Sequence, residues 1–265
     1  MSQTPAAPQV SGKMFLYDQP ELLNKETHNG LGVSPAAAPF GFAAKVRALP
    51  LTVSEIIPAS QQYPVVFMSL EEPTPMAVVG LIDDINLFVD ETGQWEQDVY
   101  IPGYVRRYPF GVATEENGDR FAIVVDAGFE GLKQGGDAPL FEADGEPSKF
   151  TQDAVEFTKK YEQDRQLTSQ FVSEMKAVDV LAGQTAQYTP GNAGDPVGFA
   201  QYIGLDENKL KDLPDEGFLE LRRKGLLPLL YAQAMSMNNW RGVVMRRARR
   251  YNLNDANLFQ PLNLS

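Results

Sequence analysis

Residues 86–110 read NLFVDETGQWEQDVYIPGYVRRYPF. The stretch combines one Trp, three Tyr, two Phe and an adjacent pair of Arg. This mixture is too polar for an ordinary core strand and too aromatic for an ordinary loop. Its apolar beginning, 86–89, predicts a strand, and the DETG sequence after it predicts a turn, because Gly93 takes positive φ at no steric cost. The stretch therefore indicates a β-rich region that also carries aromatic rings and cations.

Short apolar runs typical of strands lie on both sides of this stretch. Turns rich in Gly, Pro and Asp separate them, which favours antiparallel pairing between neighbours. The strands predicted in this half of the chain are 46–51, 64–69, 76–82, 86–89 and 121–126.

A helical pattern replaces the strand pattern after Gly145. Apolar residues at helical intervals predict one helix over 148–182, or two helices joined near Gln163. Ser148 or Thr151 is the expected N-cap. Beyond this helix we expect a loop at 188–196, a strand at 197–203, a helix at 206–213 with Asp206 as its N-cap, a helix at 216–224, and a final helix from 228 to about 250.

Strands in the first half and helices in the second predict an α+β fold. We expect a mainly antiparallel, twisted sheet from the N-terminal half, packed against helices from the C-terminal half. The 265 residues are expected to form a single domain over 14–252, in which 146–252 is a candidate helical subdomain. Residues 1–13 are predicted to form a disordered arm and 253–265 a C-terminal tail.

The composition excludes several kinds of chemistry. The chain has no Cys and a single His, which excludes disulfides, thiolate metal sites, Cys nucleophiles and multi-histidine metal sites within one chain. A net charge of −12 argues against general nucleic-acid binding. No signal peptide is visible, and the most apolar run, 225–237, is shorter than the roughly 20 residues that span a bilayer. We therefore expect a cytoplasmic protein without a membrane span.

Six segments resemble the SapC-like family, in the order found in that family, and together cover roughly residues 40–247. The most specific is YIPGYVRRYPF, because an aromatic-Pro run with two Arg is improbable by chance. The segments are VVFMS (65–69), NLFVDETGQW (86–95), YIPGYVRRYPF (100–110), APLFEADGEP (138–147), IGLDENKLKDL (203–213) and GLLPLLYAQAMSMNNWRGV (225–243).

The resemblance implies a cellular context for the protein but no reaction mechanism. The family is tied to bacterial surface-array (S-layer) proteins and their export. Similar proteins are also associated with outer-membrane receptors and with flavin-dependent halogenase-like enzymes. The resemblance supplies no catalytic residues that can be carried over to this chain.

The strongest candidates for binding are the adjacent Arg106 and Arg107. The planar guanidinium of an Arg can donate two parallel hydrogen bonds to a carboxylate or a phosphate, and it can stack on a neighbouring aromatic ring. Because successive residues of a strand point to opposite faces, at most one of the two is expected inside a given pocket. The alternative is structural: one Arg pairs with an acid while the aromatic residues pack on the sheet. The candidate ligand- or partner-binding residues are Trp95, Tyr100, Tyr104, Arg106, Arg107 and Tyr108.

Other polar residues predict no reaction. His28 is expected in a turn of a mobile arm rather than in a catalytic triad. The acids at 83–84 are expected to begin a turn, and a dyad or hard-cation site that includes Asp90 is the weaker interpretation. The Gly-rich stretches 131–139 and 190–198 lack the phosphate-loop and dinucleotide-binding patterns. We therefore predict no catalytic residues, no metal site and no cofactor.

A basic helix near the C-terminus contrasts with the acidic body: residues 238–253 carry five Arg and no acid. Three interpretations are open. The arginines form a solvated helix end stabilised by the helix dipole, dock on the protein's own acidic surface or an acidic partner, or bind nucleic acid or a membrane. The negative charge of the acidic body opposes binding to nucleic acid or a membrane unless the helix extends beyond about 8 Å, the distance over which physiological salt screens charges. The candidate basic residues are Arg246, Arg247, Arg249 and Arg250.

Three functions are compatible with these features. The first is a non-catalytic binding or accessory protein that recognises a peptide or protein partner, because aromatic and Arg-rich segments are favoured at recognition surfaces. The second is an enzyme that uses carboxylates and Arg on a small anionic or peptide-like substrate. The third is a regulator that acts through the basic helix.

Overall fold

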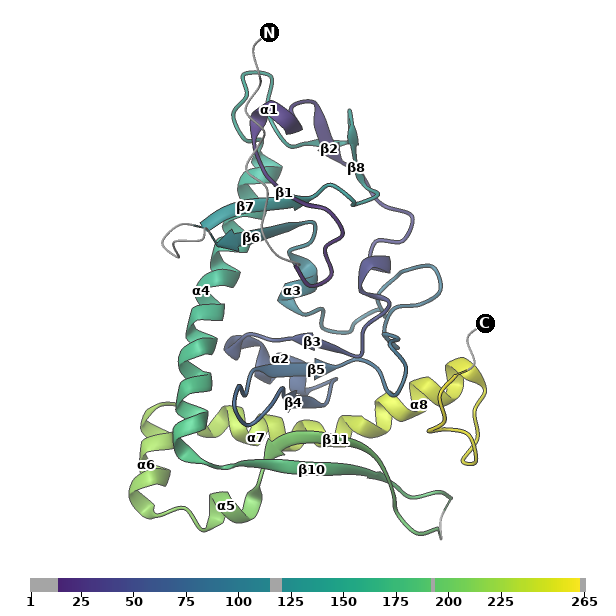
Figure 1. Ribbon diagram of the computed structural model, residues 1–265, viewed down its shortest axis with the longest axis vertical. Coiled ribbons are helices and arrows are strands. Elements are labelled where there is room, and N and C mark those ends of the chain that lie inside the picture. The colour runs from purple at the N-terminus through teal and green to yellow at the C-terminus, as the bar shows by residue number, and fades with distance from the viewer. Residues whose placement is uncertain (1–13, 115–120, 192–193, 263–265) are drawn as a thin grey trace. The chain divides into compact units, whose positions relative to one another are not determined.

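A computed structural model describes residues 14–114, 121–191 and 194–262 (Figure 1). Contacts within the chain divide it into two compact units, each built from two separated stretches. The first unit comprises 1–42 and 105–163, and the second comprises 43–104 and 164–265. The arm predicted at 1–13 lies outside the described residues. The single domain over 14–252 and its helical subdomain stay predictions.

The first unit contains two three-stranded antiparallel sheets, with strand orders β1-β7-β6 and β8-β2-β9. Its strands are β1 (Pro20–Leu22), β2 (Leu31–Val33), β6 (Phe110–Thr114), β7 (Phe121–Asp126), β8 (Leu132–Gln134) and β9 (Ala138–Pro139). Its helical elements are α1 (Lys25–His28), the end of α3 (Gly103–Arg106), and the part of α4 (Lys149–Val178) up to Gln163.

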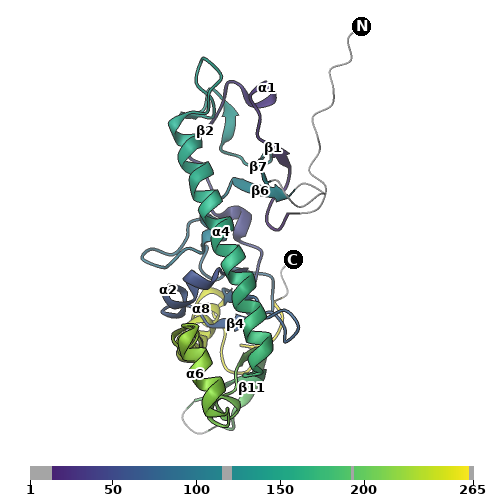
Figure 2. The same ribbon diagram turned by 90° about the vertical axis from the view of Figure 1, so that its left-hand side faces the viewer.

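The core of the first unit gathers around Phe110, Val125 and Leu140, which are all buried. Residues from β2, β7 and β8 pack against this cluster, and so does Ala154 of α4. Figure 2 shows the first turns of α4 beside β2. Because Phe110 is the first residue of β6, the core fixes the chain immediately after the Arg106–Pro109 segment.

The second unit contains a five-stranded antiparallel sheet with the strand order β10-β11-β4-β5-β3. Its strands are β3 (Ala48–Pro50), β4 (Val65–Phe67), β5 (Pro75–Val78), β10 (Leu181–Tyr188) and β11 (Val197–Leu205). Its helices are α2 (Ile56–Ser60), the part of α4 after Gln163, α5 (Glu207–Lys211), α6 (Asp215–Arg223), α7 (Leu227–Ser236) and α8 (Trp240–Tyr251). Short 3₁₀ turns are η1 (Gly41–Ala43, whose first two residues belong to the first unit), η2 (Val53–Glu55) and η3 (Met237–Asn239).

Helix α7 packs on β4 and β11, and Figure 1 shows it running along these strands. Its buried Gln233 joins the two strands where their own ladder is short. The Gln233 side chain accepts a hydrogen bond from Leu205 N (3.0 Å) and donates one to Val65 O (3.0 Å). Ser236 Oγ accepts from Val65 N (2.9 Å). Since buried backbone groups need partners, these two side chains complete the sheet between β4 and β11.

The predicted α+β class is confirmed, because the strands pair antiparallel and helices dominate the second half of the chain. Of the two alternatives for residues 148–182, the single helix is confirmed. Thr151 N donates to Ser148 Oγ (3.2 Å), so Ser148 caps α4, and Asp206 caps α5 as predicted. Within the described residues, none of the helices combines the length and the apolar character that crossing a membrane requires.

Four local predictions are wrong. Residues 86–89, predicted as a strand, do not form one, and Val89 makes only an isolated β-bridge with Trp95. Residues 181–182, assigned to the long helix, begin strand β10, whose pairing with β11 overrides the local pattern. The final helix is two helices, because η3 interrupts it between α7 and α8. His28 is buried at the end of α1 rather than exposed in an arm, with Nδ1 2.9 Å from Thr27 Oγ1, although Gly30 does form the predicted turn with φ +79°.

We predict that Gln233→Ala lowers the free energy of unfolding of the second unit by about 2–4 kcal/mol, because Leu205 N and Val65 O both lose a buried partner. Urea denaturation followed by tryptophan fluorescence measures this, since both Trp residues, Trp95 and Trp240, belong to the second unit. Gln201→Ala, at an exposed position of β11, is the control and should change stability by less than about 0.5 kcal/mol. Equal effects of the two variants would contradict the bridging role of Gln233.

Candidate functional site

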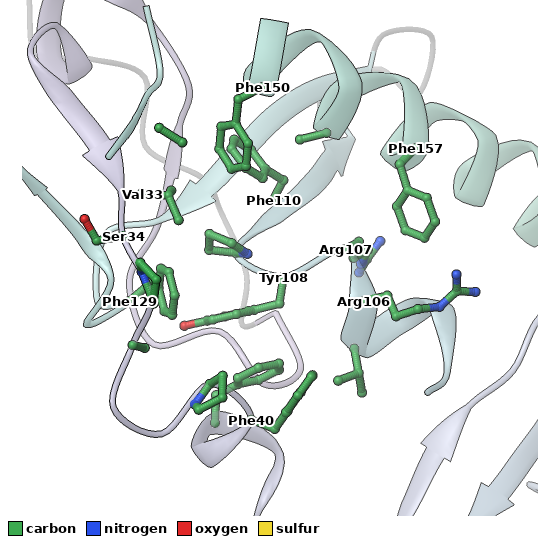
Figure 3. A pocket seen from close by; sticks show the side chains of 18 of the residues that line it. Val33, Ser34, Phe40, Arg106, Arg107, Tyr108, Phe110, Phe129, Phe150 and Phe157 are labelled. Atoms are coloured by element: carbon green, nitrogen blue, oxygen red, sulfur yellow. The ribbon is translucent and has the colours of Figure 1, made fainter. Parts of the chain in front are cut away.

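An aromatic pocket of about 790 Å³ opens in the first unit (Figure 3). In Figure 3, Phe129 and Phe157 lie at opposite ends of the view, and Tyr108 lies between them. Three prolines and several small residues complete the wall. The aromatic lining residues are Phe40, Phe42, Tyr108, Phe110, Phe129, Phe150 and Phe157.

One wall of the pocket is a face of α4. Phe150, Ala154 and Phe157 follow each other at intervals of four and three residues, which places them on the same side of a helix. Ala154 also packs on the core, and its small side chain lets the helix approach the core closely. The rings of Phe150 and Phe157 lie on either side of Ala154 along the helix. Phe150 is 37% exposed, although large apolar residues are usually buried. The α4 wall therefore presents rings to the pocket as well as to the core.

Tyr108 forms the middle of the pocket, and two ring contacts and a hydrogen bond hold it in position. Its ring stacks on Phe42 with a centroid separation of 3.8 Å and packs edge-on against Phe129 at 5.3 Å. Its hydroxyl donates a hydrogen bond to Asp126 Oδ2 at 2.9 Å. Burial, together with the hydrogen bond and the negative charge of Asp126, raises the pKa of Tyr108 above its ordinary value. Tyr108 is therefore a neutral, rigid ring at physiological pH.

Arg107 is a structural residue. Its side chain is 5% exposed, and its Nη1 lies 3.4 Å from Oε1 of the buried Glu162 on α4. The guanidinium also lies over the ring of Tyr161 at 4.8 Å and near that of Tyr17 at 5.9 Å. Removing one member of such a buried pair leaves the other charge without compensation, which is strongly destabilising. Arg107 thus matches the structural alternative, in which one Arg pairs with an acid.

Arg106 is exposed at the edge of the same pocket. Its guanidinium carbon lies 5.2 Å from the centroid of the Phe157 ring, which is within the range of a cation–π contact. Figure 3 shows Arg106 next to Phe157, on the side of the view opposite to Ser34. Residues 103–106 form the short helix α3 and not the expected strand, so both arginines contribute to the lining of one pocket. The expectation that at most one of them would do so is wrong.

The structure separates the six candidate binding residues into two groups. Arg106, Arg107 and Tyr108 line the pocket, whereas Trp95, Tyr100 and Tyr104 belong to the second unit and are not among its lining residues. Trp95 is buried, and the Tyr100 hydroxyl donates to the buried Glu55 (2.8 Å). Trp95 and Tyr100 thus contribute to the packing of the second unit. The aromatic lining residues outside the segment that the sequence singled out are Phe40, Phe42, Phe129, Phe150 and Phe157.

Three of the four candidate basic residues of α8 bind their own chain within the second unit. Arg246 donates to both carboxylate oxygens of Glu96 (2.7 and 2.8 Å), a bidentate geometry. Arg250 donates to Asn86 O (3.2 Å) and Val89 O (2.8 Å). Arg249 is exposed. For Arg246 and Arg250 the structure shows docking on the chain itself rather than a solvated helix end.

Arg247 is the buried Arg of this helix, with a side chain only 1% exposed. Its Nη1 lies 2.5 Å from Asp83 Oδ2, and it donates to the carbonyls of Leu81, Leu258 and Gln260. The guanidinium therefore ties α8 to both the 81–83 bend and the residues that follow the helix. Asp84 lies 2.8 Å from Arg47 Nε, so the two adjacent acids have separate partners.

We predict that Arg247→Met lowers the free energy of unfolding of the second unit by about 3–5 kcal/mol, because Asp83 and three carbonyls lose a buried cation. Arg249→Met, the same substitution at an exposed position of the same helix, should change it by less than about 0.5 kcal/mol. Tryptophan fluorescence in urea measures both variants. A loss at Arg249 as large as that at Arg247 would contradict the assignment.

We predict that Tyr108→Phe weakens the alkaline loss of stability. The folded pKa of Tyr108 is raised, so the native protein keeps this proton while the unfolded chain loses it above its pKa of about 10. The contribution of Tyr108 is therefore complete below pH 10 and declines above it, by up to about 1.4 kcal/mol per pH unit. Urea midpoints by circular dichroism at pH 9 and 11 should fall further in the wild type than in the variant. Tyr63, whose pKa burial also raises, is present in both proteins and cancels. Identical slopes would contradict the shift.

Comparison with known proteins gives one match. A search of curated proteins and a search of solved structures found no match to this chain. The family model described as SapC matches residues 23–243, which is most of the chain and includes the segment from Arg106 to Phe110 and the α4 wall. The chain therefore belongs to the SapC family.

Proposed function

We propose that this chain is a non-catalytic binding or accessory protein that recognises a peptide or protein partner through the aromatic pocket of its first unit. The observation that carries the proposal is the pocket of about 790 Å³, lined by rings that are partly exposed. Its volume lies in the range of about 300–1,000 Å³ that is typical of ligand sites. Aromatic side chains and Arg are the residues that most often dominate binding energy at protein interfaces.

The polar groups of the pocket support binding over catalysis. The Tyr108 hydroxyl donates to Asp126, Ser34 Oγ accepts from Asp137 N (3.1 Å), and Arg107 pairs with Glu162. These groups hold the walls in place. An enzyme would need an acid, base or nucleophile directed at a substrate, so we place the carboxylate–Arg enzyme second.

The resemblance to the family supports a proposal for the cellular setting of this function. We propose a cytoplasmic accessory role linked to bacterial surface-layer or outer-membrane receptor systems, or to flavin-dependent halogenase-like enzymes. The docking of Arg246, Arg247 and Arg250 on their own chain makes a regulator that acts through the basic helix the weakest of the three functions.

Filling the pocket tests the proposal. Ala36 lines the pocket, whereas the adjacent Ala37 is exposed and is not among the lining residues. Peptides are selected from a random phage-displayed library on the immobilised wild-type protein, and their affinities are measured by fluorescence anisotropy. We predict that Ala36→Trp weakens the selected peptides by at least about tenfold, because an indole occupies apolar volume that the ligand needs. Ala37→Trp should leave their affinity unchanged.

Two results would contradict the proposal. If the library yields no peptide whose binding Ala36→Trp weakens, the pocket is not a recognition site for peptides. If Ala36→Trp and Ala37→Trp weaken binding equally while circular dichroism shows both folded, the binding surface lies elsewhere. The double replacement of Arg106 and Arg107 by Ala is unsuitable as a test, because loss of the buried Arg107 would unfold the site itself.

A further inference from the structure

We propose that two copies of this chain associate through the outer edge of strand β10, so that their five-stranded sheets continue into each other. The two β10 strands would run antiparallel about a two-fold axis at Gln184. This surface belongs entirely to the second unit and shares no residue with the aromatic pocket of the first.

The backbone groups of alternate β10 residues point away from the sheet. Strand β10 is the outermost strand and pairs with β11 on one side (Figure 1). Asp206 N donates to Val180 O (2.9 Å) at the start of the pairing between the two strands. Hydrogen-bonded and non-hydrogen-bonded pairs alternate in an antiparallel ladder. Counted from this first pair, Gly183 and Thr185 direct their N–H and C=O groups outward.

The chain occupies both ends of this edge and leaves its middle open. Lys209 Nζ donates to Leu181 O (3.1 Å), so this outward carbonyl already has a partner. At the other end, a register shift after Ala186 interrupts the ladder. Among the described residues, no hydrogen bond joins the outward groups of Gly183 or Thr185, and both residues are exposed. An exposed strand edge with open N–H and C=O groups is a template for another strand.

The distribution of charge favours a second copy of the chain as the partner. The chain carries a net charge of −12, which opposes self-association wherever acidic surfaces meet. Residues 180–205, which contain the β10–β11 hairpin, include a single charged residue, Asp195, although 22% of the whole chain is charged. Strand β10 itself has neither a charged residue nor a Pro, the residues that commonly prevent pairing at sheet edges. The hairpin is therefore a neutral surface through which two acidic chains can approach each other.

The open groups of β10 are complementary to themselves in one register. When Gln184 lies opposite its own counterpart, Gly183 lies opposite Thr185 on both sides of the axis. Each of these pairs then exchanges both of its N–H···O hydrogen bonds. The Leu181 carbonyl, which Lys209 occupies, lies outside the paired segment. Because each such bond has a modest net value, we expect a weak and reversible dimer.

A single introduced cysteine tests the register. The natural chain has no Cys, so Gln184→Cys carries the only thiol. At the axis, the two copies of residue 184 form a non-hydrogen-bonded pair with Cα atoms about 4.5 Å apart, which suits a disulfide. With oxidised glutathione as the oxidant, we expect Gln184→Cys to form a covalent dimer at least about tenfold faster than Gln187→Cys or Gln201→Cys on non-reducing gels. Both control positions are more exposed than Gln184, so exposure cannot explain this difference.

Charge substitutions test the same axis without a covalent bond. Gln184→Lys and Gln184→Glu each place like charges directly opposite each other in the dimer, which is unfavourable between strands. By sedimentation equilibrium, we expect each variant alone to dimerise at least about threefold more weakly than the wild type, and an equimolar mixture of the two to regain the loss. Gln201→Lys and Gln201→Glu are matched controls on β11, and mixing them should change nothing.

Three results would overturn the inference. They are a wild type that stays monomeric up to about 1 mM, equal coupling at the three cysteine positions, and a mixture of the Gln184 variants that associates no better than each alone. If the Gln184 variants fail to fold by circular dichroism, Thr185→Pro takes their place, because it removes an outward N–H that the monomer does not use. Thr185→Pro should weaken the dimer, whereas Thr185→Ser should keep it. Peptide binding that depends on Ala36 is measured separately, so either result leaves the proposed function of the pocket unaffected.

Discussion

The first unit depends on how the buried carboxyl group of Asp126 is satisfied. Both oxygens accept hydrogen bonds, from the backbone N–H groups of residues 18, 19 and 128 and from the Tyr108 hydroxyl. A buried carboxyl without such partners would be costly, so these segments must stay together. They are far apart in sequence, and the bonds join the segment before β1, the end of β7 and the chain that enters β6. The ring of Tyr108, and with it the pocket, takes its place from this arrangement.

The adjacent arginines have very different surroundings. Arg107 lies inside the unit between Glu162 and two tyrosine rings, and it holds α4 against the 105–110 segment. Arg106, one residue earlier, lies at the rim on Phe157. Because α3 ends at Arg106, the two side chains are not constrained to opposite faces as they would be on a strand. Arg107 is buried inside the unit, whereas Arg106 is exposed at the edge of the pocket.

Much of the fold could be predicted from local signals in the sequence. The apolar runs at 64–69 and 121–126 contain β4 and β7, and the caps Ser148 and Asp206 mark the starts of α4 and α5. Strand β10 could not be found in this way, because LAGQTAQY is made of small and polar residues that continue from a helix. Its strand conformation comes from pairing with β11, a tertiary contact that overrides the weak local preference.

The site was predictable only in part, for the same reason. The YVRRYPF segment drew attention to Arg106, Arg107 and Tyr108, yet the rings around them come from residues 40–42, 129 and 150–157, which are distant in sequence. Their convergence depends on the packing of α4 and of the 33–42 stretch, which no spacing reveals. Likewise, a run of Arg in α8 shows positive charge but not which acids and carbonyls face it. Glu96 and Asp83, its acidic partners, lie about 150 or more residues earlier in the chain.

The unequal surroundings of the two arginines set how each position can change during evolution. Position 107 accepts few replacements, and even Lys is unsuitable, because an ammonium cannot stack on Tyr161 while reaching Glu162 with a planar fork. Position 106 is exposed and contacts the ring of Phe157, so a replacement there removes less buried contact than one at position 107. Within the family, the exposed position 106 would then vary more freely than the buried position 107.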